Sequence, residues 1–412
     1  MSSAGFDYSA MFKGSVPPPG PRWAGFPRYN FVGGHNDAAL IPCDGLAEAA
    51  ATVLRREGAI LATYGVGHGP LGYASLREFV ARKSAAHRGI AATADDVLIT
   101  VGSAQGIDLV NALLVERGDT VIVEEFSFAG ALSRLRKLGA TIIGAPLDGQ
   151  GLRIDALETI LSELKGRGVR PKYIYTIPTI QNPTGSVLPL ERRRALLAFA
   201  RRYGVVVFED ECYADLVWAG AAPPALHALD PSGVLHIGSF SKSLAPALRL
   251  GFVIAPWEVL GRMLAVRSDG PGALEQMVVA EYFARHFDDH AQRLAAGLHA
   301  KLDTLVEVLE REFGTAVEFR RPDGGIFLWL RLPEGVDVRR LVQPAAAASV
   351  AFNPGPDWAA DPDAAAPWMR LCFALPTEAE IRDGVAALAQ VCAEQTGIPA
   401  RRANLLTRSD GR

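Results

Sequence analysis

VVVFEDECY, at residues 205–213, begins with four apolar residues and runs into three adjacent carboxylates. A continuous apolar run of this length is typical of a β-strand that is covered on both faces. Six similar runs flank it in the chain: VLITVG (97–102), TVIVEE (120–125), ATIIGAP (140–146), YIYTIP (173–178), VLHIGSF (234–240) and GFVIAP (251–256). Because amphipathic stretches lie between most of these runs, the pattern predicts an α/β fold with a large, mostly parallel seven-stranded sheet.

The rest of the chain is predicted to form an arm and a second domain. Residues 1–45 are rich in Pro, Gly and aromatic residues, and we expect an arm that contributes to the small domain and the substrate pocket. Residues 46–285 are assigned to the large domain. One or two long helices are expected over 272–312. The second domain, at 286–412, is expected to be smaller and of the α+β type. The polar tail after about residue 396 is expected to be loosely held.

Charge and composition exclude several classes of protein. The 42 Lys and Arg against 45 Asp and Glu give a net charge of −3, so no nucleic-acid or membrane-surface partner is expected. Arg192 to Arg194 are interpreted as part of a solvated helix face. No stretch approaches the roughly 18 apolar residues of a membrane helix, and the N-terminus has no export-signal pattern.

Four cysteines are spread along the chain, at Cys43, Cys212, Cys372 and Cys392. No pair has the CxxC spacing of a structural zinc site, so no metal is expected. Without an export signal we expect reduced thiols and a cytoplasmic protein. Cys212 is interpreted as an inert core thiol.

Residues just after strand ends are candidates for chemistry, because α/β sheets bind ligands beyond the carboxyl ends of their strands. SFSKSLAPALRLGF (239–252) places Lys242 between two serines at such an end. A lysine that is partly desolvated beside other cations has a lowered pKa and becomes a nucleophile. The serines and Arg249 could hold a phosphate, although an ordinary serine-rich surface loop would have the same sequence.

Three further strand ends carry polar groups. Asp210 ends a buried strand, where its carboxylate needs a partner such as a protonated pyridine nitrogen, or serves as a helix cap. IPTIQNPTG (177–185) is a rigid turn that offers the amide of Asn182. TVGSAQGIDLV (100–110) turns into a helix at Ser103, whose N-terminus could bind phosphate or be capped by the serine itself.

These four segments, in this order, resemble the fold-type I pyridoxal 5′-phosphate (PLP) enzymes of aminotransferase class I/II. The wording VGSAQGIDLV, IQNPTG, EDECY and SFSKSLAPALRLGF is similar to the 2-aminoadipate, kynurenine and aromatic aminotransferases and to the aminotransferase-like domains of MocR regulators. The resemblance extends from about Phe31 to the C-terminus. It implies a homodimer with shared active sites that transfers an amino group from an L-amino acid to a 2-oxo acid in ping-pong half reactions.

The resemblance also implies roles for individual residues at the cofactor ring. Lys242 matches the lysine that forms the Schiff base with PLP and shuttles the proton. Asp210 matches the partner of the pyridine nitrogen. Asn182 and Tyr213 match the pair that contacts the ring oxygen. The bond between Asn182 and Pro183 is often cis in the family.

Further matches concern the phosphate and the substrate. The phosphate cup is matched by Ser103, the backbone of Ala104, Ser239, Ser241 and Arg249. Phe128 matches the aromatic residue that stacks on the ring, and Tyr64 the tyrosine that reaches the phosphate from the other subunit. Arg370 matches the arginine that binds the α-carboxylate of the substrate. Gly33 and Gly34 match the arm segment that closes over it.

Other functions remain open at this point. The same cofactor site serves oxygen-using oxidases, cyclising synthases and lyases. GHGPLG (67–72) fits the GxGxxG pattern of dinucleotide-binding enzymes, but AILATYGV before it is a poor strand. A MocR-type regulator needs a DNA-binding domain, which the Pro- and Gly-rich residues 1–45 are not expected to form.

The arm sequence departs from its relatives. His35, Asn36 and Asp37 stand where an apolar residue and a proline are common. They suggest a polar or cationic substrate, and a plain surface turn is the alternative.

Overall fold

A seven-stranded sheet forms the centre of the computed structural model, which describes residues 7–399 except 15, 21, 24, 219 and 221. Its strands are β2 (Val97–Val101), β3 (Thr120–Glu124), β4 (Thr141–Ala145), β7 (Tyr173–Thr176), β8 (Val206–Asp210), β9 (Val234–Ser239) and β10 (Leu250–Ile254). The order is β2-β10-β9-β8-β7-β3-β4, and only β10 runs antiparallel to its neighbours. The predicted α/β fold and its seven-stranded, mostly parallel sheet are confirmed. The tail prediction falls largely on residues 400–412, outside the described residues.

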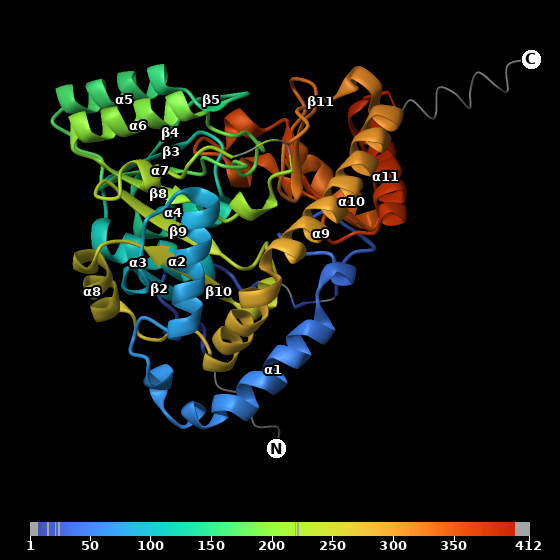
Figure 1. Cartoon of the computed structure of the whole chain (residues 1–412). Helices are drawn as coiled ribbons and strands as arrows, with labels where there is room; N and C mark the ends of the chain where they lie inside the picture. Colours follow the sequence, from blue (N-terminus) through green and yellow to red (C-terminus); the bar gives the residue numbers. More distant parts are fainter. Residues whose placement is uncertain are drawn as a thin grey trace, which may run out of the picture.

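Helices cover both faces of this sheet (Figure 1). They are α2 (Ala74–Arg88), α3 (Gly102–Leu114), α4 (Ala129–Leu138), α5 (Ile154–Gly166), α6 (Leu190–Tyr203), α7 (Leu226–Leu229) and α8 (Trp257–Val266), while α1 (Cys43–Glu57) lies away from the sheet, against the long helix α9 (Ala273–Phe313). Alternate side chains of a strand point to opposite faces, so Val121 packs with α3 and α4, while Ile122 packs with α5 and α6. Both faces are apolar because both are covered.

One long helix joins the two halves of the molecule. α9 (Ala273–Phe313) is a single helix of 41 residues. Its first part packs against α1 and α2, and its last part against α11 (Glu378–Thr396) (Figure 1). The predicted domain boundary at 285/286 falls inside this helix. No helix in the described part of the chain is long and apolar enough to cross a membrane.

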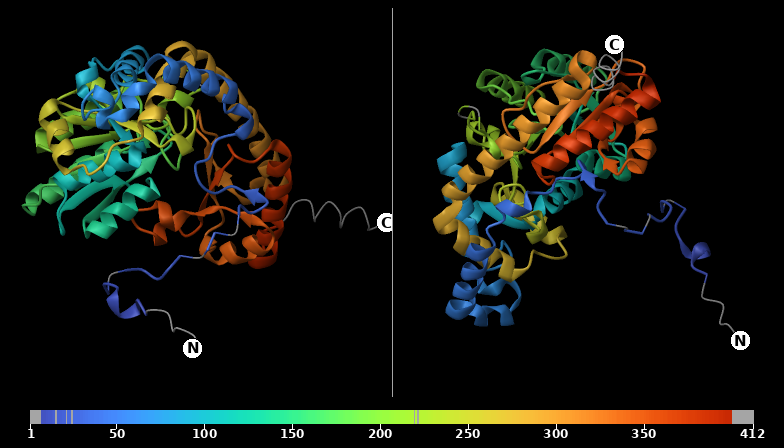
Figure 2. Two further views of the ribbon diagram at one scale, coloured as in Figure 1. Left: turned by 90° about the horizontal axis from the view of Figure 1, so that it is seen from below. Right: turned by 90° about the vertical axis from the view of Figure 1, so that its right-hand side faces the viewer.

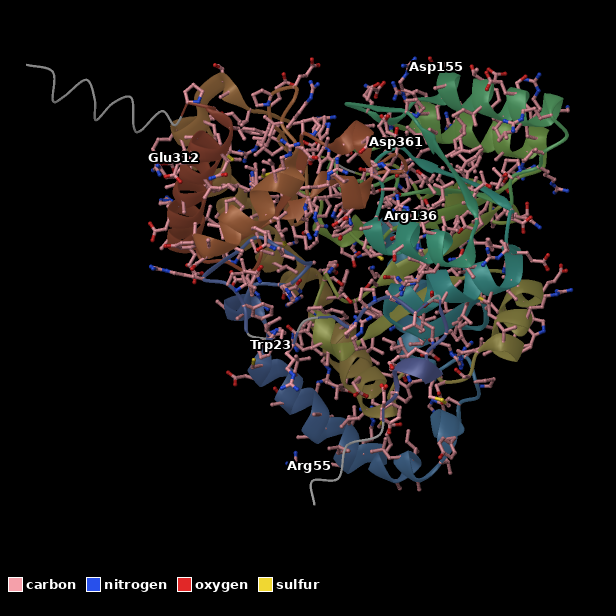
Figure 3. All side chains as sticks on the ribbon, turned by 180° about the vertical axis from the view of Figure 1, so that it is seen from behind. Trp23, Arg55, Arg136, Asp155, Glu312 and Asp361 are labelled. Atoms are coloured by element: carbon pink, nitrogen blue, oxygen red, sulfur yellow. The ribbon has the colours of Figure 1, made fainter. Side chains whose placement is uncertain are left out.

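A second sheet lies beyond α9. Its strands are β11 (Glu318–Phe319), β12 (Phe327–Arg331), β15 (Trp368–Cys372) and β14 (Asn353–Pro354), in that order and antiparallel. The remaining elements include β5 (Leu147–Asp148) paired with β6 (Gly151–Leu152), and α10 (Val342–Ala347). Arg136 of α4 donates to the carbonyl of Ala359 at 2.7 Å, which ties α4 to the segment that contains Asp361 (Figure 3).

The N-terminal arm pairs with this second unit. β1 (Tyr29–Asn30) runs parallel to β13 (Val350–Ala351). Before β1, the described part of the arm runs away from the body (Figure 2), and Trp23 is 81% exposed. Residues 58–67 form the 3-10 helices η3 (Gly58–Ala62) and η4 (Tyr64–Gly67), so the stretch before GHGPLG is not a strand.

Arg193 is fully buried, and its interpretation as part of a solvated helix face is wrong. Its guanidinium donates to the carbonyls of Leu188 and Pro178, both at 2.8 Å, and to Pro224 at 3.1 Å. It also lies 3.5 Å from the carboxylate of Glu211. The number of charged residues in this helix does not predict the burial of Arg193. The turn at 177–189 has carbonyls that no strand hydrogen-bonds, and the guanidinium supplies donors to them.

We expect Arg193→Met to lower the free energy of unfolding by about 3–5 kcal/mol, since it leaves buried carbonyls and part of the charge of Glu211 without a partner. Urea denaturation measures the loss, with the exposed neighbour Arg194→Met as the matched control. Equal midpoints for the two variants would contradict a structural role for Arg193.

Candidate active site

A cavity of about 330 Å³ opens between the carboxyl edge of the large sheet, the arm and the second sheet. It is lined by Gly33, Gly34, Ser103, Ala104, Phe128, Ile177, Asn182, Asp210, Cys212, Tyr213, Ser239, Ser241, Lys242, Arg249, Asn353, Trp358 and Arg370. Every predicted cofactor- or carboxylate-binding residue is in this set except Tyr64, whereas the suggested substrate contacts His35, Asn36 and Asp37 are not. Residues more than 300 positions apart in the chain, such as Gly34 and Arg370, therefore meet in one place.

Lys242 lies just beyond the end of β9, with its amine inside the cavity. The Nζ atom donates to the carbonyl of Gly34 at 2.5 Å. A side chain at Gly34 would collide with this amine, which explains a glycine there. Burial lowers the pKa of Lys242, and the charges of Arg370 and Arg249 lower it further.

Asp210 is the last residue of β8 and is almost fully buried. The hydroxyl of Tyr175 donates to its Oδ2 at 2.7 Å, and the backbone N–H of Cys212 donates to its Oδ1 at 3.1 Å. Burial raises the pKa of Asp210, and a cation beside its carboxylate would oppose this by favouring the ionised form. Burial, and then the charge of Asp210, also raise the pKa of the Cys212 thiol, which stays protonated.

Hydrogen-bond donors also line this cavity. α3 begins at Gly102 and Ser103, so its free backbone N–H groups face the cavity end where Ser103 and Ala104 lie. Arg249 lies beside them in the left-handed region (φ +53°), and a Cβ at Gly102 would come within 2.6 Å of its Nη2. With the hydroxyls of Ser239 and Ser241, these groups form an anion-binding cup.

Arg370 on β15 closes the side that faces the second sheet. It donates to the Oδ1 of Asn182 at 3.0 Å, to the carbonyl of Gly33 at 2.6 Å and to the Oδ1 of Asn353 at 2.9 Å. Its guanidinium lies 3.7 Å over the ring of Trp358, and its buried Nε has no partner among the described residues.

Asn182 connects this side to the cofactor end of the cavity. Its Nδ2 donates to the hydroxyl of Tyr213 at 3.2 Å. The peptide between Asn182 and Pro183 is cis, as the resemblance implied.

Trp358, Asn353 and Ile177 were missed at the sequence level. Asn353 precedes a proline in β14, directly opposite Arg370 in the strand register. The sequence does signal Asn353, because in VAFNPG (350–355) it follows a short apolar run, as the site residues of the large sheet do. Nothing in GPDW (355–358) singles out Trp358.

Two polar arm residues are engaged away from the cavity. Asn36 donates to the carbonyl of Leu244 at 2.9 Å. Asp37 pairs with Lys301 at 2.6 Å and accepts from the N–H of Ala39 at 2.9 Å. The carboxylate of Asp37 and the N–H group of Asn36 are thus engaged by the protein, and neither residue lines the cavity, which favours the alternative of a turn over a role in substrate selection.

Two other predicted contacts differ in their placement. His35 is half-buried, and burial followed by the charge of Lys242 lowers its pKa. Tyr64 is fully exposed in η4 and lies outside the cavity of its own chain. Among the described residues, no group of three or more His, Cys, Asp or Glu side chains could hold a metal ion.

A buried lysine, a carboxylate and an anion cup at the carboxyl edge of such a sheet define a fold-type I PLP enzyme. The family model described as aminotransferase class I and II matches residues 35–388. The chain is 35% identical to the 2-aminoadipate transaminase of Thermus thermophilus over 333 residues, 79% of this chain and 80% of that protein. It is 30% identical to aromatic-amino-acid aminotransferase 1 of Thermococcus litoralis over 371 residues, 89% of this chain and 88% of that one.

The solved structures agree with the sequence comparison. The crystal structure of the α-aminoadipate aminotransferase of Thermus thermophilus, complexed with N-(5′-phosphopyridoxyl)-L-leucine, superposes with a TM-score of 0.82. It is 33% identical and covers 90% of this chain and 93% of that chain. The chain therefore belongs to the class I and II aminotransferase family and is a PLP-dependent enzyme that transfers amino groups.

The residues present fit this cofactor. PLP carries a phosphate and a ring nitrogen, and the cavity lining includes both a group of anion donors and the carboxylate of Asp210. A Cβ at Gly251 would come within 2.6 Å of the backbone of Gly102 and Ser103, so only glycine lets β10 support the cup. The amine of Lys242 lies in the same cavity.

We expect Asp37→Asn to leave the preference between L-lysine and L-phenylalanine unchanged within about twofold, because its carboxylate is paired with Lys301 and touches no substrate. The ratio of kcat/KM for the two amino acids measures this preference. His35→Asn is the comparison variant, since His35 lies closer to Lys242. A loss confined to L-lysine in Asp37→Asn would contradict the placement.

Proposed function

We propose that the amino transfer takes place in the 330 Å³ cavity and that Lys242 moves the proton. The observation that carries this proposal is the buried amine of Lys242, which lies in the same cavity as the anion cup and Asp210. When bound, the cofactor would supply an electron sink that stabilises the carbanion left by loss of the α-proton. A lowered pKa leaves more of the Lys242 amine neutral at a given pH, which a base requires.

The remaining cavity residues would hold the cofactor. Asp210 would face the ring nitrogen, where a positive charge would stabilise its buried carboxylate. Asn182 and Tyr213, already hydrogen-bonded to each other, would contact the ring oxygen. Phe128 would stack on the ring. The phosphate would lie in the cup formed by Ser103, Ala104, Ser239, Ser241 and Arg249.

Arg370 would bind the α-carboxylate of the amino acid. Its donors now engage Asn182, Gly33 and Asn353, all within one cavity wall. A carboxylate could take a fork-shaped pair of these N–H groups and release part of that network. Gly33, whose carbonyl accepts from Arg370, and Gly34, whose carbonyl accepts from Lys242, both lie in the arm. Substrate binding would therefore reposition the arm.

The test is the absorption spectrum of the holoenzyme with single L-amino acids and no 2-oxo acid. We expect the visible-edge band to shift to shorter wavelength, with one equivalent of 2-oxo acid released. Arg370→Lys should need roughly 30- to 150-fold more amino acid for half of the shift, the effect of losing about 2–3 kcal/mol of charged hydrogen bonding.

The exposed Arg340→Lys serves as the control, and it should titrate like the wild type. Oxygen uptake or a long-lived band at longer wavelength would point instead to an oxidase, synthase or lyase. A spectrum without any such band after PLP is added would overturn the role of Lys242.

We propose further that the enzyme is a cytoplasmic homodimer. The support for a dimer is the exposure of Tyr64, which would complete the phosphate cup of a partner subunit. All four cysteines are unpaired, in keeping with a reducing compartment. Residues 46–285 would form the cofactor domain, and the arm would join 286–412 in a domain that moves with substrate.

Subunit mixing tests the role of Tyr64. A heterodimer of Lys242→Ala and Tyr64→Ala subunits, purified through two different tags, would carry one intact site and one doubly defective site if Tyr64 acts across the interface. We expect about half of the wild-type turnover per dimer. Turnover no higher than that of the Tyr64→Ala homodimer would contradict the proposal.

A further inference from the structure

A second cavity, of about 500 Å³, lies between the two sheets and shares no lining residue with the active site. It is lined by Glu125, Phe126, Leu147, Asp148, Gly149, Thr184, Ser186, Glu318, Phe319, Arg320, Trp329 and Trp368. One wall follows β3 and β5 of the large unit, and the other belongs to β11, β12 and β15. The catalytic reaction as described uses none of these side chains.

Aromatic rings form one side of this cavity. Trp329 and Trp368 stack with centroids 5.3 Å apart and planes 11° apart, and Phe126 lies 5.5 Å from each. Trp329 is buried, whereas Phe126, Phe319 and Trp368 are only partly buried. Aromatic rings attract cations through their quadrupole, and the guanidinium of Arg331 already lies 5.8 Å from the centroid of the Trp368 ring.

The lining of this cavity has more carboxylates than cations. The carboxylates are Glu125, Asp148 and Glu318, and the cation is Arg320. Two of the three are already paired: Asp148 with Arg192 at 2.8 Å, and Glu318 with Arg331 at 3.3 Å.

Glu125 is the carboxylate that lacks a cation. Its Oε1 accepts from the N–H of Leu147 at 2.6 Å, and no basic side chain in the described part of the chain lies within ion-pair distance. Burial raises its pKa, although the more distant charge of Arg153 opposes this. Arg320 is half exposed and lies 4.0 Å from Asp323. A cation placed at Glu125 would therefore compensate a charge that the protein leaves uncompensated.

We propose that this cavity binds a small arylalkyl-ammonium ion, with its ring against Phe126, Phe319 and Trp368 and its cationic nitrogen at Glu125. The aromatic faces and the single unpaired carboxylate supply the two contacts that such an ion needs. The ligand bridges the two sheets behind the active site, because Phe126 and Trp368 each lie two residues before an active-site residue, Phe128 and Arg370.

Isothermal titration of the holoenzyme with benzyltrimethylammonium tests the proposal. Its quaternary nitrogen cannot condense with the aldehyde of the cofactor, so the titration is independent of the amine chemistry. We expect one saturable site per chain. Glu125→Gln and Phe319→Leu should each weaken binding roughly five- to tenfold, whereas Arg320→Gln should tighten it by a few fold.

Trp257→Leu is the matched control, since Trp257 is 62% exposed on α8, and it should bind the probe as the wild type does. Cofactor absorbance and the urea midpoint report whether each variant is folded. Two results would overturn the proposal: no saturable binding up to about 10 mM probe, or equal affinity in the wild type, Glu125→Gln and Phe319→Leu.

Discussion

The buried guanidinium of Arg370 is the contact on which the arrangement of the molecule depends. It binds the arm through Gly33, the large unit through Asn182 and the second sheet through Asn353. A guanidinium can do this because it has five N–H donors in one plane. The cavity exists where these three segments meet. We propose that a substrate carboxylate engages this same group, so one residue would both organise the cavity and bind the substrate.

Polar groups at the carboxyl edge of the large sheet form a connected network of hydrogen bonds. Glu124 at the end of β3 accepts from Thr176 at 2.6 Å and from Gln181 at 3.0 Å. Gln181 also donates to the carbonyl of Phe126 at 2.7 Å, which positions the turn before Asn182. Burial raises the pKa of Glu124 to about 7. The rigid turn IPTIQNPTG thus owes its shape to a buried carboxylate as well as to its prolines.

Sequence reasoning succeeded where one local pattern has one structural outcome. The seven apolar runs could be covered strands only, and the polar residues at their ends had to gather at one edge. It failed where the same residue type has two outcomes. Arg193 is charged yet buried, because carbonyls of a distant turn require its donors. Asp37 is a loop carboxylate yet unavailable to substrate, because Lys301 on α9 approaches it.

The sequence alone determined the α/β class and the strands, because strand periodicity is a local pattern, and its lysine, aspartate and serine segments carried the family resemblance that predicts the cofactor residues. Tertiary structure decided what depends on contacts between distant segments. Pairing of β14 with β15 placed Asn353 beside Arg370, and the 3-10 helix Gly355–Trp358 placed Trp358 under its guanidinium. The aromatic cavity arose in the same way, since Phe126 meets Trp329 and Trp368 only after the two sheets pack. Such contacts depend on the relative positions of whole elements, which no local pattern encodes.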